Sequence, residues 1–169
     1  FMVSDVRVIV TGGAGFIGSH FTEKLYRDGH EVIVIDNLSS GKLSNIAHLV
    51  NSGEVMFVRA DLKDPAGSWG KYFIGADAVF HFAANPEVRV SVTNPRTHFN
   101  ENILATFNVL EQCRINDVGL LIFASSSTVY GDAERLPTPE NYQPLEPISV
   151  YGAAKLACEY LIITYSKLY

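Results

Sequence analysis

Tyr151 and Lys155 are the first residues whose types and spacing suggest chemistry, because they stand four apart at the start of a predicted helix over Tyr151–Leu168. Residues four apart on a helix share one face, so both side chains can act on one atom. A free tyrosine has a pKa of about 10 and is a poor base at neutral pH, but a nearby ammonium favours the phenolate. The pair can therefore remove a proton, although the same spacing also occurs on exposed helix faces without function.

A run of hydroxyl side chains supplies the context that the pair needs. The predicted strand Leu120–Ala124 leads directly into Ser125-Ser126-Ser127-Thr128, followed by Val129-Tyr130-Gly131. Side chains at the carboxyl end of a parallel strand lie at the mouth of the sheet, where open α/β proteins bind ligands. One hydroxyl there can hydrogen-bond a substrate oxygen while Tyr151 takes its proton.

Near the amino end, the predicted strand Arg7–Thr11 is followed by a glycine-rich turn and a predicted helix over Phe16–Asp28. The glycines fit two registers, Gly13-x-Gly15-x-x-Gly18 and Gly12-x-x-Gly15-x-x-Gly18. Such a turn lets a pyrophosphate approach bare backbone at the N–H groups of a helix start. A tight turn that binds nothing uses the same residues.

Asp36 favours the dinucleotide interpretation of that turn. It ends the predicted strand Glu31–Asp36 and stands eighteen residues after Gly18, close to the spacing of about 20 at which an acidic residue reaches the adenosine ribose. A carboxylate accepts both ribose hydroxyls and repels a 2′-phosphate. The sequence therefore predicts NAD rather than NADP, with Lys42 as the nearby cation that can weaken this preference.

Short β-branched runs alternate with amphipathic stretches, which is typical of βαβ units and a parallel sheet. The predicted strands are Arg7–Thr11, Glu31–Asp36, Val55–Arg59, Ala78–Phe82 and Leu120–Ala124, and the predicted helices are Phe16–Asp28, Leu43–Val50, Asn100–Arg114 and Tyr151–Leu168. The expected fold class is α/β, a doubly wound parallel sheet of the Rossmann type. Since that fold has six strands, we expect residues 1–169 to be the NAD-binding domain and amino-terminal part of a longer protein.

The segment Asp132–Ser149 holds four of the seven prolines and is predicted to be a surface loop that roofs a pocket. It leaves the fifth predicted strand at the carboxyl end, where ligands bind in open α/β sheets.

Composition excludes several classes of function. The net charge of −5 and the absence of a Lys/Arg cluster argue against a nucleic-acid partner. No apolar run approaches the roughly 20 residues that span a bilayer, and Phe1–Asp5 has no secretory signal character. Cys113 and Cys158 are expected to be buried, reduced thiols, so we expect a cytoplasmic protein, and no metal site is predicted.

Taken together, the motifs resemble the extended short-chain dehydrogenase/reductases, and within them most closely the UDP-glucose (UDP-galactose) 4-epimerases. The resemblance covers the whole chain. It rests on Thr11 to Gly18, Asp36-Asn37, Asp61-Leu62, His81 to Ala84, Asn102, Ser125 to Gly131 and Tyr151 to Lys155.

The resemblance implies a role for each matching position. The pyrophosphate is held by Gly12, Gly15, Phe16 and Ile17. The adenosine is surrounded by Asp36, Asn37, Leu38, Ser39, Ser40 and Gly41, with Asp61 and Leu62 beside the adenine. The centre of the cofactor is lined by Phe82, Ala83 and Ala84, and Asn102 braces the site. The catalytic residues are Ser126 as the hydroxyl, Tyr151 as the base, and Lys155 as its ribose-binding and pKa-lowering partner.

The resemblance also implies a reaction in which Tyr151 takes the proton of the C4 hydroxyl of a UDP-sugar while hydride passes to NAD. Nucleotide-sugar 4,6-dehydratases and UDP-glucuronate decarboxylases share this first step. Dehydratases usually place Asp-Glu before Val-Tyr-Gly and decarboxylases usually keep the Glu, whereas this chain has Ser127-Thr128, which favours epimerisation. A non-catalytic NAD-binding module is the alternative from another class.

The resemblance also bears on position 86 and on the expected oligomeric state. Many epimerases carry a cofactor-reaching Lys where this chain has Pro86. Family members form homodimers through the helices matching Asn100–Arg114 and Tyr151–Leu168, so a homodimer is expected, although packing on the chain's own sheet accounts equally well for the apolar residues of these helices.

Overall fold

The computed structural model describes residues 6–169, and the prediction made for Phe1–Asp5 lies outside this range. The described chain forms two compact units. Unit 1 comprises residues 6–84 and Asn108–Ala124, and unit 2 comprises Asn85–Phe107 and Ser125–Tyr169.

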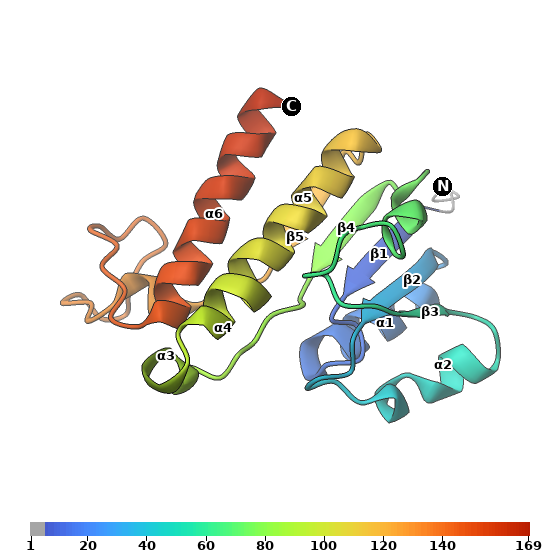
Figure 1. The fold of residues 1–169 in the computed structure, drawn as a ribbon, viewed down its shortest axis with the longest axis horizontal. Helices are drawn as coiled ribbons and strands as arrows, with labels where there is room; N and C mark the ends of the chain where they lie inside the picture. Colours follow the sequence, from blue (N-terminus) through green and yellow to red (C-terminus); the bar gives the residue numbers. More distant parts are fainter. Residues whose placement is uncertain (1–5) are drawn as a thin grey trace. The chain divides into compact units, whose positions relative to one another are not determined.

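Unit 1 contains one parallel sheet of five strands in the order β3-β2-β1-β4-β5 (Figure 1). The strands are β1 (Arg7–Thr11), β2 (Glu31–Asp36), β3 (Met56–Arg59), β4 (Ala78–His81) and β5 (Leu120–Phe123). All four pairings are parallel, and the order matches the first five strands of the dinucleotide-binding fold. The predicted α/β class and all five strands are confirmed, with three of the strands one residue shorter than predicted.

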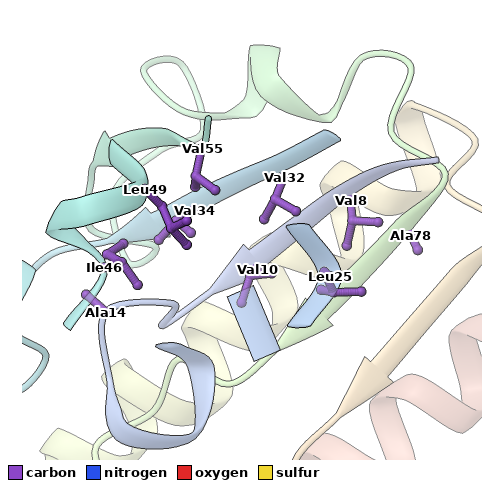
Figure 2. Close-up of a cluster of buried hydrophobic side chains, with 10 residues drawn as sticks. All are labelled: Val8, Val10, Ala14, Leu25, Val32, Val34, Ile46, Leu49, Val55 and Ala78. Atoms are coloured by element: carbon purple, nitrogen blue, oxygen red, sulfur yellow. The ribbon is translucent and has the colours of Figure 1, made fainter. Parts of the chain in front are cut away.

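Both faces of the central strands are buried. Successive side chains of a strand point to opposite faces, and Val8 and Val10 are buried just as Ile9 is. The same holds in β2, where Val32 and Val34 alternate with the buried Ile33 and Ile35. The face that carries the four valines of β1 and β2 packs into the cluster drawn in Figure 2. This cluster consists of Val8, Val10, Ala14, Leu25, Val32, Val34, Ile46, Leu49, Val55 and Ala78. Coverage on two faces explains why these strands are continuous apolar runs.

Helix α1 (Phe16–Arg27) follows β1, as predicted, and Gly29 in the left-handed region (φ +89°) allows the chain to leave it. The helix predicted over Leu43–Val50 is wrong as a single element. It is divided into the 3₁₀ turn η1 (Leu43–Asn45) and α2 (Ala47–Asn51). The Asn45 amide donates to the Ala14 carbonyl (2.8 Å), so this segment follows the glycine-rich loop rather than a regular helix. The 3₁₀ turn η2 (Gly70–Phe73) was not predicted.

In unit 2, the helix predicted from Asn100 begins earlier and changes type along its length. The short helices α3 (Val90–Thr93) and α4 (Arg96–His98) lead into a π-helical stretch, η3 (Phe99–Leu104), and then into α5 (Ala105–Ile115), whose residues belong to both units. Apolar periodicity does not reveal a π turn, which often marks a functional site.

The remaining elements of unit 2 are the 3₁₀ turn η4 (Ser127–Tyr130) and helix α6 (Val150–Leu168), which was predicted to begin one residue later. Residues 131–149 contain no helix or strand, which confirms the predicted loop.

No helix in the described part of the chain is long and apolar enough to cross a membrane. Within residues 6–169 there is also no group of three or more His, Cys, Asp or Glu side chains that could hold a metal ion.

Both cysteines are buried and free, as predicted. Burial raises the pKa of the Cys113 thiol to about 12 and also raises the pKa of the Cys158 thiol. Because the thiolate is the nucleophile, neither residue should be alkylated by iodoacetamide at about pH 8 in the folded protein. Mass spectrometry of the two peptides should show both modified only after denaturation. Rapid native labelling of either peptide would contradict this packing.

Candidate functional site

The loop after β1 is shaped by contacts between backbone segments. Gly12 lies in the left-handed region (φ +68°), and its N–H donates to the Ile35 carbonyl (2.9 Å). A Cβ added to Gly12 would stand 2.6 Å from the Ala83 nitrogen and 2.8 Å from the Ala83 Cα. Only glycine therefore allows this loop to pass so close to the chain that follows β4.

The other two glycines of the motif differ in what surrounds them. A Cβ on Gly18 would stand 2.2 Å from the Gly12 carbonyl oxygen, so close packing of helix on loop requires glycine there. A Cβ on Gly15 would meet only that same oxygen, at 3.2 Å, among the described atoms within 4 Å. The space above Gly15 is thus open, and the adjacent Phe16 and Ile17 are 81% and 54% exposed. An open glycine before the first turn of a twelve-residue helix fits an approaching pyrophosphate.

The Asp36 carboxylate joins two segments. One oxygen accepts the Ala14 N–H (3.0 Å) and the other accepts the Leu38 N–H (2.8 Å). The side chain is 8% exposed, and each ionised carboxylate oxygen has a second lone pair. Asp36 therefore fixes the glycine-rich loop to the turn after β2, a structural role that its spacing in the sequence did not reveal. Its carboxylate still has the capacity to accept ribose hydroxyls.

The turn from Leu38 to Gly41 packs on the same loop. Leu38 has a positive φ of 60°, and a Cβ on Gly41 would stand 2.9 Å from the Ala14 carbonyl carbon. Ser39 and Ser40 are exposed, as is Lys42, whose backbone N–H donates to the Ala14 carbonyl (3.0 Å). The turn thus borders the glycine-rich loop, where an adenosine would lie beside Asp36.

Asn37 and Asp61 form a polar pair beside that turn. The Asn37 amide donates to Asp61 (3.1 Å), which also accepts the Lys63 N–H (3.0 Å). Partial burial acts to raise the pKa of Asp61, but these hydrogen bonds and the Lys63 charge outweigh it and hold the pKa below its usual value. Leu62 is buried, and its carbonyl accepts the Asn108 amide (2.7 Å). A charged Asp61 is available for hydrogen bonding to a ligand.

A buried pair at the ends of β1 and β4 was not assigned a role from the sequence. The Thr11 hydroxyl lies 2.6 Å from His81 Nδ1 and accepts the Ala83 N–H at 3.3 Å. Both side chains are fully buried. The pair fixes the start of the segment Phe82-Ala83-Ala84, each residue of which is partly exposed. The polar Thr and His in otherwise apolar strands were the signal for this contact.

Unit 2 holds the residues predicted to act on a substrate. Tyr151 and Lys155 are both buried, and the Lys155 ammonium lies 6.0 Å from the centre of the Tyr151 ring. Burial lowers the pKa of Lys155, against a smaller opposing effect of Cys158. The Tyr151 N–H donates to the Ser91 hydroxyl (3.1 Å). The i, i+4 pair predicted from the sequence therefore exists as one buried group on α6.

Ser126 caps the turn η4. Its Oγ accepts the Thr128 N–H (3.3 Å) and the Thr128 hydroxyl (2.9 Å), and neither contact uses the proton of Ser126. That proton can donate to a substrate oxygen. The neighbouring Ser125 hydroxyl donates to Glu159 on α6, which fixes the serine turn to the helix that carries Tyr151.

Asn102, in the π-helical stretch η3, binds both backbone groups of Asn85. Its Oδ1 accepts the Asn85 N–H (2.7 Å), and its Nδ2 donates to the Asn85 carbonyl (3.3 Å) and faces His98 Nδ1 (3.2 Å). Its own carbonyl accepts the Cys158 thiol (3.5 Å). Asn102 thus holds the backbone of Asn85, the residue after Ala84. His98, which was not predicted from the sequence, contacts the same Asn102 amide.

The loop after η4 borders a hollow within unit 2. Its lining includes Ser127 and Tyr130 from the turn, and Asp132, Leu136 and Thr138 from the loop. The proline-rich segment, which was predicted to roof a pocket, therefore borders a hollow inside unit 2. Pro86, which stands where relatives of the expected family have a Lys, is exposed.

The predicted site residues thus form two groups. The glycine-rich loop, Asp36 to Gly41, Asp61, Leu62 and Phe82 to Ala84 lie in unit 1, whereas Asn102, Ser126, Tyr151 and Lys155 lie in unit 2. A parallel sheet of this strand order, with an open glycine before the helix and an acidic residue ending β2, defines a dinucleotide-binding protein of the Rossmann class.

Residues 8–169 match the family described as NAD dependent epimerase/dehydratase. Because the match covers nearly the whole sequence, the chain belongs to this family.

Individual relatives of this chain include UDP-glucose and UDP-galactose 4-epimerases. The UDP-glucose 4-epimerase of Mycolicibacterium smegmatis is 36% identical over 97% of this chain and 52% of its own length. A solved UDP-galactose 4-epimerase is 55% identical with a TM-score of 0.86, over 96% of this chain and 52% of that one. The UDP-glucose 4-epimerase of Thermus thermophilus, solved in complex with NAD, is 41% identical with a TM-score of 0.86, over 97% of this chain and 52% of that one. The chain spans about half the length of these relatives.

Gly15 and Gly18, one open and one enclosed, give a matched test. Gly15→Ala should cost less stability than Gly18→Ala, because Gly15 has ordinary extended angles (φ −74°, ψ 177°) and its added Cβ would stand 3.2 Å rather than 2.2 Å from the Gly12 oxygen. It should weaken NAD binding roughly tenfold or more by filling the approach to the backbone. Gly18→Ala should instead lower the free energy of unfolding by about 1–3 kcal/mol through its clash with Gly12. Calorimetric titration with NAD and thermal melts separate the two. Equal effects of both substitutions on stability would contradict this assignment.

Asp36 gives a second test. Asp36→Asn keeps one oxygen acceptor but turns an NH2 donor toward the other backbone N–H, so it should weaken NAD binding and also lower stability. Asp36→Ala leaves both the Ala14 and Leu38 N–H groups without their partner and should cost about 1–3 kcal/mol of stability. NAD titrations and denaturant unfolding measure the two effects. If Asp36→Ala melts like the wild type, the carboxylate does not hold the loop.

Proposed function

We propose that the protein carrying this chain is an NAD-dependent isomerase that interconverts UDP-glucose and UDP-galactose by transient oxidation at C4 of the sugar. The observation that carries the proposal is the buried Tyr151–Lys155 pair on α6, since a phenol beside a buried ammonium can act as a base. The relatives named above support the choice of reaction and of sugar.

The open surface over Gly15 and the acidic residue at the end of β2 support NAD as the cofactor. The groups proposed to hold it are the glycine-rich loop with Phe16 and Ile17 at the pyrophosphate, Asp36 to Gly41 with Asp61 and Leu62 at the adenosine, and Phe82 to Ala84 at the centre. NAD, when bound, supplies an acceptor for hydride from C4 and a donor for its return. Lys155 is proposed to bind the nicotinamide-side ribose, and Asn102 to brace the site.

The protein's own groups manage the proton. Tyr151 takes the proton of the C4 hydroxyl as the C4–H bond breaks, and a 4-keto sugar forms. The Ser126 hydroxyl donates a hydrogen bond to the same oxygen and keeps its proton, which stabilises the developing charge, while the Lys155 ammonium favours the phenolate. Return of the proton from Tyr151 to the oxygen accompanies hydride delivery to the other face of C4, so no cofactor is consumed.

The residues around Ser126 support epimerisation over loss of water. Position 128 touches Ser126 directly through the 2.9 Å contact between hydroxyls, and it is a threonine. With Ser127 beside it, the turn offers no carboxyl group that could serve as acid or base for elimination across C5 and C6. A 4,6-dehydratase would need such a group here.

The proposal extends to the whole protein. Residues 1–169 serve as its NAD-binding domain, and the remaining length found in relatives would supply most of the nucleotide-sugar pocket. A homodimer is proposed, supported by the exposed apolar Tyr160 and Ile163 on α6 (58% and 47%). The two free cysteines support a reducing compartment such as the cytoplasm.

Tyr151→Phe tests the proposal in the intact protein. It should lower kcat for conversion of UDP-galactose to UDP-glucose by about 100-fold or more, because general-base catalysis contributes roughly 10²–10⁴. NAD should stay bound, since the ring and helix are unchanged. Tyr169→Phe, a change of the same kind at an exposed position (74%) at the end of the same helix, is the matched control and should be neutral. Full activity of Tyr151→Phe would remove Tyr151 as the base.

A further inference from the structure

His98 is the last residue of α4 and is fully buried. Its ring stands edge-on to the Tyr151 ring, with centroids 5.5 Å apart and an interplanar angle of 67°. Edge-to-face pairs of this kind restrict the orientation of both rings. His98 is therefore a direct neighbour of the proposed base, although it is far from it in the sequence.

The protonation of His98 can be derived from its partner Asn102. The Asn85 N–H must donate to an oxygen, and the Asn85 carbonyl must accept from a nitrogen, so the two contacts of 2.7 and 3.3 Å fix which end of the Asn102 amide is which. The Asn102 Nδ2, a donor only, then faces His98 Nδ1 at 3.2 Å. His98 Nδ1 must accept, which leaves the proton of the neutral ring on Nε2.

The charges around His98 do not reverse this state. Burial lowers the pKa of His98, while the Glu101 carboxylate and the Glu87 carbonyl act more weakly to raise it. Glu101 accepts the Asn85 amide (2.9 Å), and the Lys155 ammonium lies 6.0 Å from the centre of the Tyr151 ring. A proton on Nδ1 would face the Asn102 N–H, so the hydrogen-bond geometry and the burial favour the same neutral ring.

We propose that His98 is a positioning residue for Tyr151: a neutral imidazole, held by Asn102 through Nδ1, whose ring edge fixes the direction of the Tyr151 phenol relative to the Lys155 ammonium. This inference rests on the proposed function, in which that phenol is the base. The Tyr151 backbone is already held by Ser91 (3.1 Å). His98 restricts the remaining freedom, which is rotation of the side chain.

The consequence concerns the rate of the chemical step. A base must be held within hydrogen-bond reach of the proton that it takes, so a Tyr151 ring that is free to rotate spends less time in a reactive orientation. Loss of His98 should therefore lower kcat more than it changes KM.

Two substitutions test the role in the intact protein. His98→Ala should lower kcat about tenfold, with KM changed less than about twofold. His98→Phe retains a ring against Tyr151 and should recover most of the lost kcat. His48→Ala, an exposed histidine on α2, is the control. A purely structural role predicts lower stability and fewer active molecules, with kcat per NAD-loaded molecule unchanged in both His98 variants, and that result would overturn the proposal.

A second readout needs neither a variant nor activity. In the protein labelled with ¹⁵N-histidine, the resonances of His98, assigned by their loss in His98→Phe, should be those of a ring protonated at Nε2 only. This state should persist to a pH below the ordinary histidine pKa of about 6.5, because burial lowers the pKa of His98. Protonation near pH 6.5, or a proton on Nδ1, would overturn the inference. If the wild type converts no UDP-galactose while His98 shows this state, the proposed function fails and the Asn102–His98 arrangement stands.

Discussion

Backbone packing at the carboxyl ends of β1 and β4 is the constraint on which unit 1 depends. Gly12 faces the Ala83 backbone, and Gly18 faces the Gly12 carbonyl, at separations that no Cβ can occupy. These contacts hold the loop at Gly12 and Gly18 and leave the backbone at Gly15 uncovered. The shape proposed to bind the pyrophosphate is thus a consequence of how the sheet and α1 pack, and Asp36 joins that loop to the turn proposed to border the adenosine.

Unit 2 is organised by polar side chains instead. Asn102 uses its whole amide to hold Asn85 and His98, and Glu159 holds the serine turn through Ser125. Lys155 is buried beside Tyr151, where an ammonium costs more to charge but acts more strongly on a phenol. Fixed side chains are suited to proton transfer, which is sensitive to small displacements, just as fixed backbone is suited to holding a dinucleotide.

Much of the fold follows from the sequence because parallel strands covered on both faces are continuous apolar runs, and β1 and β2 were predicted to the residue. The glycine-rich loop and Asp36 were likewise identified from spacing and chemistry. The π-helical stretch at Phe99–Leu104 was not, because its one extra residue per turn leaves no clear mark on apolar periodicity. His98 was missed for a related reason: its contacts with Asn102 and Tyr151 depend on how three helices meet, and no local pattern contains that information.

In the proposed reaction, hydride leaves C4 of the sugar and returns to the same carbon without exchange. The most direct measurement is conversion of UDP-galactose carrying deuterium at C4 by the intact protein, with no NAD added and the product examined by NMR and mass spectrometry. The expected product is UDP-glucose that retains its deuterium at C4, formed by enzyme that carries its own NAD. Product that has lost the label to solvent, or bound NAD with no product at all, would contradict it.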